Sequence, residues 1–210
     1  MLVIERKEAA REIPHGVDHP VMSRMLNALM DRIECGVAAC GPAGELLHAN
    51  LAAHRELAEG RTLKVVDGRI QCVSSSREAW ASALNNAALR HRTGLVDLGH
   101  GAERLSIAAM PMQVEGMGDP MIVIMMGRRS VCSALGLEML ASSHGLTYAE
   151  SRVFRELVGN RTPREIAASH GVAVATIRTQ IQAVRDKLGV RSIDALLLRA
   201  AELPPVFARQ

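Results

Sequence analysis

Hydrophobic positions change their spacing twice along the chain, and each change predicts a change of secondary structure. Between Val21 and Glu34 the apolar residues recur three and four apart, which predicts an amphipathic helix. From residue 36 to residue 127, short apolar runs alternate with glycine-containing turns, as is typical of strands. Helical spacing returns after Arg128, so we expect a mixed part followed by a purely helical part.

The mixed part is expected to hold about five strands, with helices inserted after the second. A first hairpin is predicted from strands at 36–40 and 45–50. Helices are predicted at 51–60 and 76–92, with Ser76 as a candidate N-cap of the second. A second hairpin is predicted around Asp67-Gly68, because this dipeptide favours a type I′ turn. Three antiparallel strands follow, at 95–100, 104–114 and 121–127.

The helical part contains two sharply defined helix starts. Thr147 and Glu150 have the spacing of a capping box, in which two side chains satisfy unpaired N–H groups. Thr162 and Glu165 repeat that spacing, with Pro163 at the first helical position. Glycines at 159 and 171 can end these two helices, and a turn at 172–175 is expected before a long helix over 176–188.

The long helix is predicted to have two different faces. Its apolar stripe consists of Ile177, Ile181, Val184 and Leu188. Its polar, basic face consists of Arg178, Thr179, Gln182 and Arg185. Another helix is predicted from Ser192, and its buried side is expected to consist of Ile193, Leu196, Leu197 and Ala200. A helix, a tight turn and a helix with a basic face together predict a helix-turn-helix, whose second helix can enter a major groove.

The residue types on the polar face suit a DNA duplex. Arginine can bond guanine, glutamine can bond adenine, and a threonine methyl can contact the methyl group of thymine. The residues expected to contact bases are Arg178, Thr179 and Gln182. Contacts to phosphates give affinity and register without sequence information. The residues expected to make them are Thr162, Thr176, Arg185 and Lys187.

The stretch LTYAESRVFRELVGNRTPREIAASHGVAVATIRTQIQAVRDKLGV resembles the LuxR-type four-helix DNA-binding domain of bacterial transcription regulators. The matching positions are Leu146, Thr147, Glu150, Val153, Leu157, Gly159, Glu165, Ile166, Ala167, Thr176, Ile177, Arg178, Lys187, Leu188, Gly189 and Val190. The resemblance implies that Arg178, Thr179 and Gln182 face bases and that Thr176 and Lys187 meet phosphates. The sequence departs from the family at Tyr148, where proline is common, and at Gln180, where histidine is frequent.

The stretch GVAACGPAGELLHANLAAHRELAEG is similar to the opening of a PAS domain, and the resemblance extends over about residues 26–127. The expected fold class is therefore α+β, with a PAS-like, mostly antiparallel sheet joined by a connecting helix to an all-α four-helix domain. The expected divisions are a flexible N-terminus over 1–20, a sensory or dimerising domain over 21–127, a connecting helix over 128–143 and a LuxR-type domain over 144–210. The implied function is a transcription regulator that reads an inverted-repeat operator as a homodimer.

Charge is unevenly distributed along the 210 residues, and this agrees with a polyanionic partner for the C-terminal part. Residues 144–210 carry 10 basic and 6 acidic side chains, a net charge of +4. The preceding residues carry 15 basic and 16 acidic side chains, a net charge of −1.

The N-terminus is too charged for a signal peptide, and the longest apolar run, 121–126, is too short to span a membrane. We therefore expect a cytoplasmic protein.

The sequence disfavours several other functions for the front part. No nucleophile elbow, P-loop, HExxH or GxGxxG occurs, so no enzyme is predicted. The strand order does not fit a phosphoacceptor receiver, the single tryptophan Trp80 disfavours an acyl-homoserine-lactone pocket, and residues 51–60 lack the cysteine of a flavin photosensor. A different small-molecule ligand for the front part and contact with RNA polymerase stay open, and no cofactor is implied.

Several residues that could carry out chemistry are expected to have structural roles. Cys35, Cys40, Cys72 and Cys132 form no CxxC pair and are expected to be reduced, mostly buried thiols. His48 and His54 are expected to be surface or packing residues and not metal ligands. Asn50 is expected to cap the following helix, Trp80 to pack its helix on the sheet, and the methionines at 110–126 to fill a core. The signal, the operator and the sign of regulation are not predicted.

Overall fold

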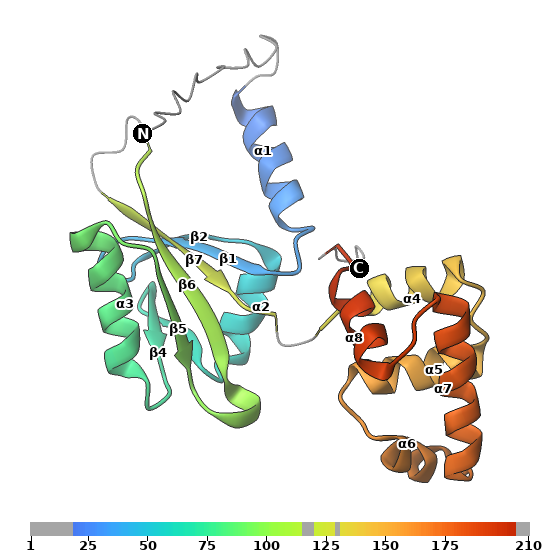
Figure 1. The fold of residues 1–210 in the computed structure, drawn as a ribbon. Helices are drawn as coiled ribbons and strands as arrows, with labels where there is room; N and C mark the ends of the chain where they lie inside the picture. The colour runs from blue at the N-terminus through green and yellow to red at the C-terminus, as the bar shows by residue number, and fades with distance from the viewer. Residues whose placement is uncertain (1–18, 115–119, 129–130, 205–210) are drawn as a thin grey trace, which may run out of the picture.

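The computed structural model describes residues 19–114, 120–128 and 131–204 of the chain. Its elements fall into a sheet-containing body, from α1 to β7, and a helical body, from α4 to α8 (Figure 1). Most of the segment predicted to be flexible, 1–20, lies outside the described residues, as does most of the turn at 115–120. Met117, one of the methionines placed in a core by the sequence, also lies outside them.

The first body is built on a five-stranded sheet with the strand order β2-β1-β7-β6-β5. The strands are β1 (Gly36–Cys40), β2 (Leu46–Ala49), β5 (Gly94–Leu98), β6 (Leu105–Met112) and β7 (Met121–Met126). Every pairing between neighbours is antiparallel. The predicted antiparallel sheet is therefore confirmed, and the helices are inserted after its second strand as expected.

The second predicted hairpin forms a separate two-stranded sheet of β3 (Leu63–Val66) and β4 (Arg69–Cys72). Asp67 and Gly68 both have positive φ, 50° and 74°. A type I′ turn requires positive φ at both central positions, and glycine adopts it at no steric cost. The local sequence thus determines this turn, and the prediction is confirmed.

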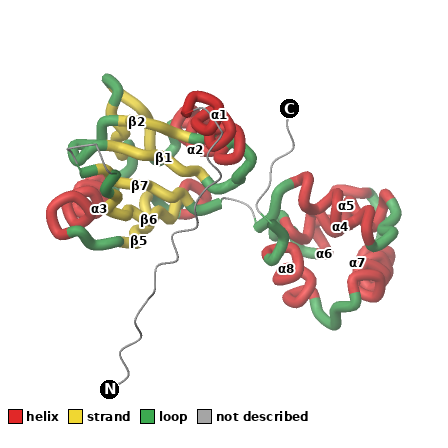
Figure 2. Tube along the Cα trace, turned by 90° about the horizontal axis from the view of Figure 1, so that it is seen from above, coloured by secondary structure: helices red, strands yellow, loops and turns green. Residues whose placement is uncertain are grey.

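One face of the large sheet is covered by α2 (Leu51–Glu59) and α3 (Arg77–Arg90), as Figures 1 and 2 show. The alternate residues of β1, β6 and β7 that point to this face form one core with Trp80 of α3 and the β3–β4 hairpin. Trp80 is buried there, as predicted. Ser76 precedes α3 but does not cap it with its side chain, contrary to the prediction; its hydroxyl accepts a hydrogen bond from the N–H of Gly99 (3.1 Å).

The opposite face of the sheet carries an apolar row that crosses four strands. Val37, Met125, Ala108 and Leu95 lie directly opposite one another on β1, β7, β6 and β5. Leu95 is 80% exposed and Met125 is 41% exposed. Aliphatic side chains in such a row are costly to leave in water. Because Met125 lies on this exposed face, it does not fill the core as the sequence predicted. Met121 and Met126 do lie buried.

Helix α1 (His19–Met30) ends four residues before the predicted boundary at Glu34. It projects from the sheet-containing body (Figure 1). The chain after α1 is held by the buried side chain of Asn50, whose Nδ2 donates to the carbonyls of Met30 (3.0 Å), Ile33 (3.4 Å) and Cys35 (3.0 Å). These bonds take carbonyl groups away from a longer helix, which explains the earlier end.

Asn50 also performs the predicted capping of α2. Its Oδ1 accepts hydrogen bonds from the N–H groups of Ala53 and Val37, both at 2.9 Å. A single buried amide thus connects the end of α1, the start of β1 and the start of α2. A ligand contact for Asn50 is not needed to explain its burial, because every polar atom of its side chain is bonded within the chain.

Among its described residues, the segment predicted as a connecting helix over 128–143 is helical only in α4 (Ala134–Ser143). Ser133 caps its start by accepting a hydrogen bond from the N–H of Gly136 (2.9 Å). Leu137 and Leu140 of α4 lie in one hydrophobic core with Phe154 of the next helix. Helix α4 is therefore packed into the helical body and is not only a connection that follows the sheet.

Four further helices complete the helical body. They are α5 (Tyr148–Val158), α6 (Pro163–His170), α7 (Val174–Leu188) and α8 (Ile193–Ala201). One core lies between α4, α5, α7 and α8, and a second lies between α5, α6 and α7. Both predicted capping boxes are present, at Thr147/Glu150 and at Thr162/Glu165. Among the described elements there is also one short 3-10 helix, Gly101–Glu103.

Candidate nucleic-acid interface

The candidate interface is built from α6, a turn at 171–173 and α7. Gly171 ends α6 with a φ of 66°, a left-handed conformation that glycine adopts without strain. Helix α7 begins at Val174, two residues before the predicted start. Val174 lies one helical turn before Ile177 and packs with it in the same core, so it extends the apolar stripe toward the N-terminus. The three-residue turn is therefore shorter than the sequence predicted.

The apolar stripe of α7 faces the interior of the helical body along its whole length. Ile177, Ile181, Val184 and Leu188 are all buried. They contact α5 and α6 on one side of the helix and α8 near its C-terminal end. The other side of α7 is consequently held in one orientation, outward from the helical body.

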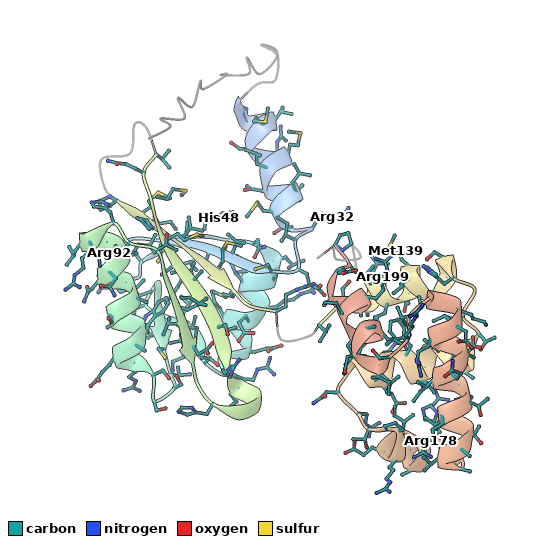
Figure 3. All side chains as sticks on the ribbon, in the orientation of Figure 1. Arg32, His48, Arg92, Met139, Arg178 and Arg199 are labelled. Carbon is teal, nitrogen blue, oxygen red and sulfur yellow. The ribbon has the colours of Figure 1, made fainter. Side chains whose placement is uncertain are left out.

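The residues predicted to contact bases all lie on that outward side. Arg178, Thr179 and Gln182 are exposed. Arg178 extends away from the helical body in Figure 3 and makes no hydrogen bond or ion pair with another described residue. Thr179 donates its hydroxyl to the carbonyl of Ala175 (3.1 Å), and Gln182 donates its amide to Asp186 (2.7 Å). The methyl group of Thr179 and the second amide hydrogen of Gln182 are the parts of these side chains that could meet a base, because the amide oxygen of Gln182 accepts from Arg185 (3.2 Å).

Two of the residues predicted to contact phosphates lie at helix starts. Thr176 is exposed in the first turn of α7, where Ala173 provides no side-chain cap. Thr162 caps α6, and its hydroxyl is bonded to Glu165: it accepts from the backbone N–H (3.3 Å) and donates to Oε2 (2.8 Å). The hydroxyl of Thr162 is thus occupied, and a phosphate contact there would have to share it.

The other two predicted phosphate contacts, Arg185 and Lys187, have partners inside the helical body. Arg185 donates to the carbonyl of Arg191 and, at 3.2 Å, to Gln182. Lys187 donates to Glu150 Oε2 (2.7 Å) and to the carbonyl of Gly145 (3.0 Å). Hydrogen bonds from Lys187 and from the backbone of Thr147 lower the pKa of Glu150. Sequence patterns could not reveal the role of Lys187, because its partners lie 42 and 37 residues away in the chain.

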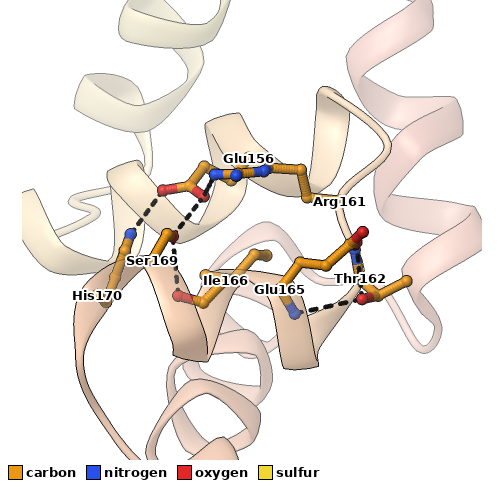
Figure 4. Close-up of polar contacts among 7 residues, drawn as sticks. All are labelled: Glu156, Arg161, Thr162, Glu165, Ile166, Ser169 and His170. Carbon is orange, nitrogen blue, oxygen red and sulfur yellow. Dashed lines mark hydrogen bonds and ion pairs between the residues drawn. The ribbon is translucent and has the colours of Figure 1, made fainter.

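A polar network fixes α6 against α5 (Figure 4). Glu156 accepts hydrogen bonds from His170 Nε2 (2.5 Å), Arg161 Nη1 (2.7 Å) and Ser169 Oγ (3.2 Å). Burial on its own would raise the pKa of Glu156, but the three hydrogen bonds outweigh it and the pKa is lowered. This carboxylate was not singled out in the sequence. It stabilises the position of the helix that precedes the turn.

The four cysteines and the histidines His48 and His54 are not part of the candidate interface. Cys40, Cys72 and Cys132 are buried and Cys35 is half-buried; none forms a disulfide. Burial raises the pKa of the Cys40 thiol to about 12 and also raises the pKa of Cys35 and Cys132, which makes them poor nucleophiles. His48 and His54 are exposed, as expected for surface histidines. In the described part of the chain, no group of three His, Cys, Asp or Glu residues could hold a metal ion.

Comparison with known proteins gives only a distant likeness. No family model and no curated protein matches the chain. A phage VqmA in complex with DPO is 17% identical, with a TM-score of 0.37, over 89% of this chain and 93% of that one. A ligand and DNA complex of Vibrio cholerae VqmA is 16% identical, with a TM-score of 0.39, over 92% of both chains. At such values the likeness assigns neither a function nor a ligand to this chain.

A further VqmA structure from Vibrio cholerae, a dimer without target DNA described in connection with LuxR-type receptors, is 14% identical. Its TM-score is 0.38, over 82% of this chain and 84% of that one. None of the described helices is both long enough and apolar enough to pass through a lipid bilayer.

Proposed function

We propose that the chain is a DNA-binding transcription regulator of the LuxR type, in which α7 is the recognition helix. One observation carries the proposal: the stripe of Ile177, Ile181 and Val184 is buried while Arg178 and its polar neighbours on α7 are exposed. Packing thereby fixes a helix of 15 residues with its arginine, threonine and glutamine side chains directed away from the protein. A helix presented in this way, after a tight turn, fits the major groove of DNA.

We further propose that the regulator acts as a homodimer, because the sheet-containing body leaves two apolar surfaces open. One is the row of Val37, Met125, Ala108 and Leu95 on the outer face of the sheet. The other is the apolar side of α1, where Met25, Leu26 and Leu29 are exposed. A helix of 12 residues is marginal in water unless its apolar side is packed. A second copy of the chain would cover both surfaces at once in a two-fold symmetric arrangement.

The dimensions of the two surfaces agree with such pairing. A helix of this length extends about 18 Å. Five strands at a spacing of about 4.8 Å extend about 19 Å across the sheet. The apolar side of α1 could therefore cross the whole row of a second sheet. The front body would then be the dimerising, PAS-like part, and two helical bodies would be available for the two halves of an operator.

The proposal is tested by selecting duplexes from a random library with the full-length protein. We expect the enriched sequences to be inverted repeats with half-sites roughly one helical turn, about 10 bp, apart. Binding should weaken steeply between about 50 and 200 mM salt, because phosphate contacts release counterions. Failure to retain any duplex at the lower salt concentration, by protein that sediments as a folded dimer, would refute DNA binding.

A further inference from the structure

A groove opens on the sheet-containing body between the β3–β4 hairpin and α3. Its volume is about 790 Å³, and the turn between β1 and β2 closes one side of it. This volume is within the range of small-molecule sites, roughly 300–1,000 Å³. Ile70, Cys72, Trp80 and Leu84 all line the groove and are themselves buried, so they form its floor. The groove therefore has an apolar base that includes the only tryptophan of the chain.

The rim of the groove is positively charged. Lys64, Arg69 and Arg77 line it and are exposed, while no aspartate or glutamate is among the described residues that line it. Arg69 is neutralised in part by Glu45, at 3.1 Å. Lys64 and Arg77 form no ion pair with another described residue. Three cations, of which only Arg69 has an anionic partner, are unusual in a part of the chain whose net charge is −1, and they favour an anionic ligand.

We propose that this groove binds a small organic acid, with its carboxylate at the cationic rim and a flat apolar group on the floor beside Trp80. An arginine and a lysine can hold a carboxylate by charge-assisted hydrogen bonds. An indole ring offers a large apolar surface to an aromatic or planar group. The amides of Gln71 and Asn85, which also line the groove, can orient polar substituents. The inference rests on the proposed function in one respect: the acid would be the signal that the regulator detects.

The full-length protein offers a direct measurement, because Trp80 is the only tryptophan. The probe is 3-phenylpropionate, which combines a carboxylate with a flat apolar ring. We expect it to change the emission of Trp80 saturably, with a Kd below about 1 mM. Two matched compounds separate the contributions: 3-phenylpropanol keeps the ring without the charge, and acetate keeps the charge without the ring. Both should bind at least about tenfold more weakly.

Arg77→Gln is the test variant, and Arg90→Gln, at the exposed C-terminal end of the same helix and outside the groove, is its control. We expect Arg77→Gln to weaken the probe about tenfold and Arg90→Gln to leave it unchanged. Absence of a saturable change in emission, an equal response to 3-phenylpropanol, or full binding by folded Arg77→Gln would each overturn the proposal. Without the probe, Arg77→Gln should bind selected DNA like the unaltered chain, so this result and the DNA-binding result are independent.

Discussion

Lys187 Nζ lies 2.7 Å from Oε2 of Glu150, and this ion pair ties the last turn of α7 to the first turn of α5. The same carboxylate oxygen accepts the N–H of Thr147 at 2.7 Å and so completes the capping box of α5. The two residues are 37 positions apart in the chain. The orientation of the candidate recognition helix is therefore linked to the helix-capping interaction at the start of α5.

Replacing Lys187 by methionine is expected to have two separate effects. Loss of the ion pair should lower the free energy of unfolding by about 1 kcal/mol, since the Glu150 carboxylate is largely shielded from water. Lysine has three donors and only two are used here, so the third can meet a phosphate. The slope of log K against log salt should then flatten by about one. Urea denaturation and binding at several salt concentrations measure the two effects, with Lys64→Met as the control; an unchanged slope would restrict Lys187 to the ion pair.

Arg178→Ala should weaken binding to the selected operator by about 1–3 kcal/mol and relax the base preference at one position of each half-site. The physical reason is that the guanidinium is exposed and has no hydrogen-bond or ion-pair partner among the described residues, so it is available for a base. Stability should change little, because the side chain is exposed. Fluorescence anisotropy with the operator and with single-base variants measures the effect. Arg90→Ala in the front body is the matched control, and equal binding by both variants would remove Arg178 from the interface.

Glu156→Gln should destabilise the protein in a pH-dependent manner. The folded-state pKa of Glu156 is lowered, so its carboxylate contributes stability that is fully present above its unfolded value of 4.5. That contribution is lost as the pH falls through the lowered folded value. The difference in unfolding free energy between the unaltered chain and Glu156→Gln should therefore be largest near neutral pH and shrink below about pH 4. Urea titrations at several pH values measure it, and the exposed Glu138 gives the control variant Glu138→Gln. A difference in unfolding free energy that does not depend on pH would contradict the lowered pKa of Glu156.

Asn50→Ala should be among the most damaging single changes in the sheet-containing body. It removes the cap of α2 and leaves several backbone groups near a fully buried site without a partner. A loss on the order of 3 kcal/mol in unfolding free energy is expected. Asn50→Asp is the informative companion, because it keeps the acceptor for Ala53 and Val37 but removes the donor to the carbonyls after α1. Chemical denaturation compares them with Asn27→Ala, an exposed position on α1.

Charge introduced on the open apolar surfaces should separate the dimer. Leu29→Glu on α1 and Leu95→Glu on β5 place carboxylates on side chains that are 56% and 80% exposed, so neither disturbs a core. Each should convert the dimer to folded monomers in analytical ultracentrifugation and weaken binding to an inverted repeat more than binding to a half-site. Leu89→Glu, on an exposed position of α3 away from both surfaces, is the control. Dimers that persist in both variants would show that the copies pair elsewhere, or that another segment of the chain covers these surfaces.

Local chemistry explains which features could be predicted from the sequence. The capping boxes at Thr147 and Thr162 and the Asp67-Gly68 turn were predicted because each depends on residues within a few positions. The start of α7 was misplaced by two residues because nothing caps it, and packing of Val174 decides where it begins. Helix α1 was predicted too long for a related reason, since a side chain 20 residues away takes up its last carbonyl.

The candidate site was predictable only in part. The exposure of Arg178 and Gln182 follows from the helical period, which places them opposite the apolar stripe. Two hydrogen bonds depend on how α5, α7 and the loop before α8 are arranged in space. They join Lys187 to Glu150 and Arg185 to the carbonyl of Arg191. The cationic groove likewise combines Lys64, Arg69 and Arg77 from three separate segments. No pattern along the chain brings such residues together.

The position of Asn50 has a consequence for how a signal could reach the operator. The direction in which α1 leaves the sheet is set by an interior amide and not by the surface that a second subunit would contact. A rearrangement that moves Asn50 would displace the carbonyl at the end of this helix, even when the contacting side chains are unaltered. Changes in quaternary geometry can therefore originate in the interior of a single subunit.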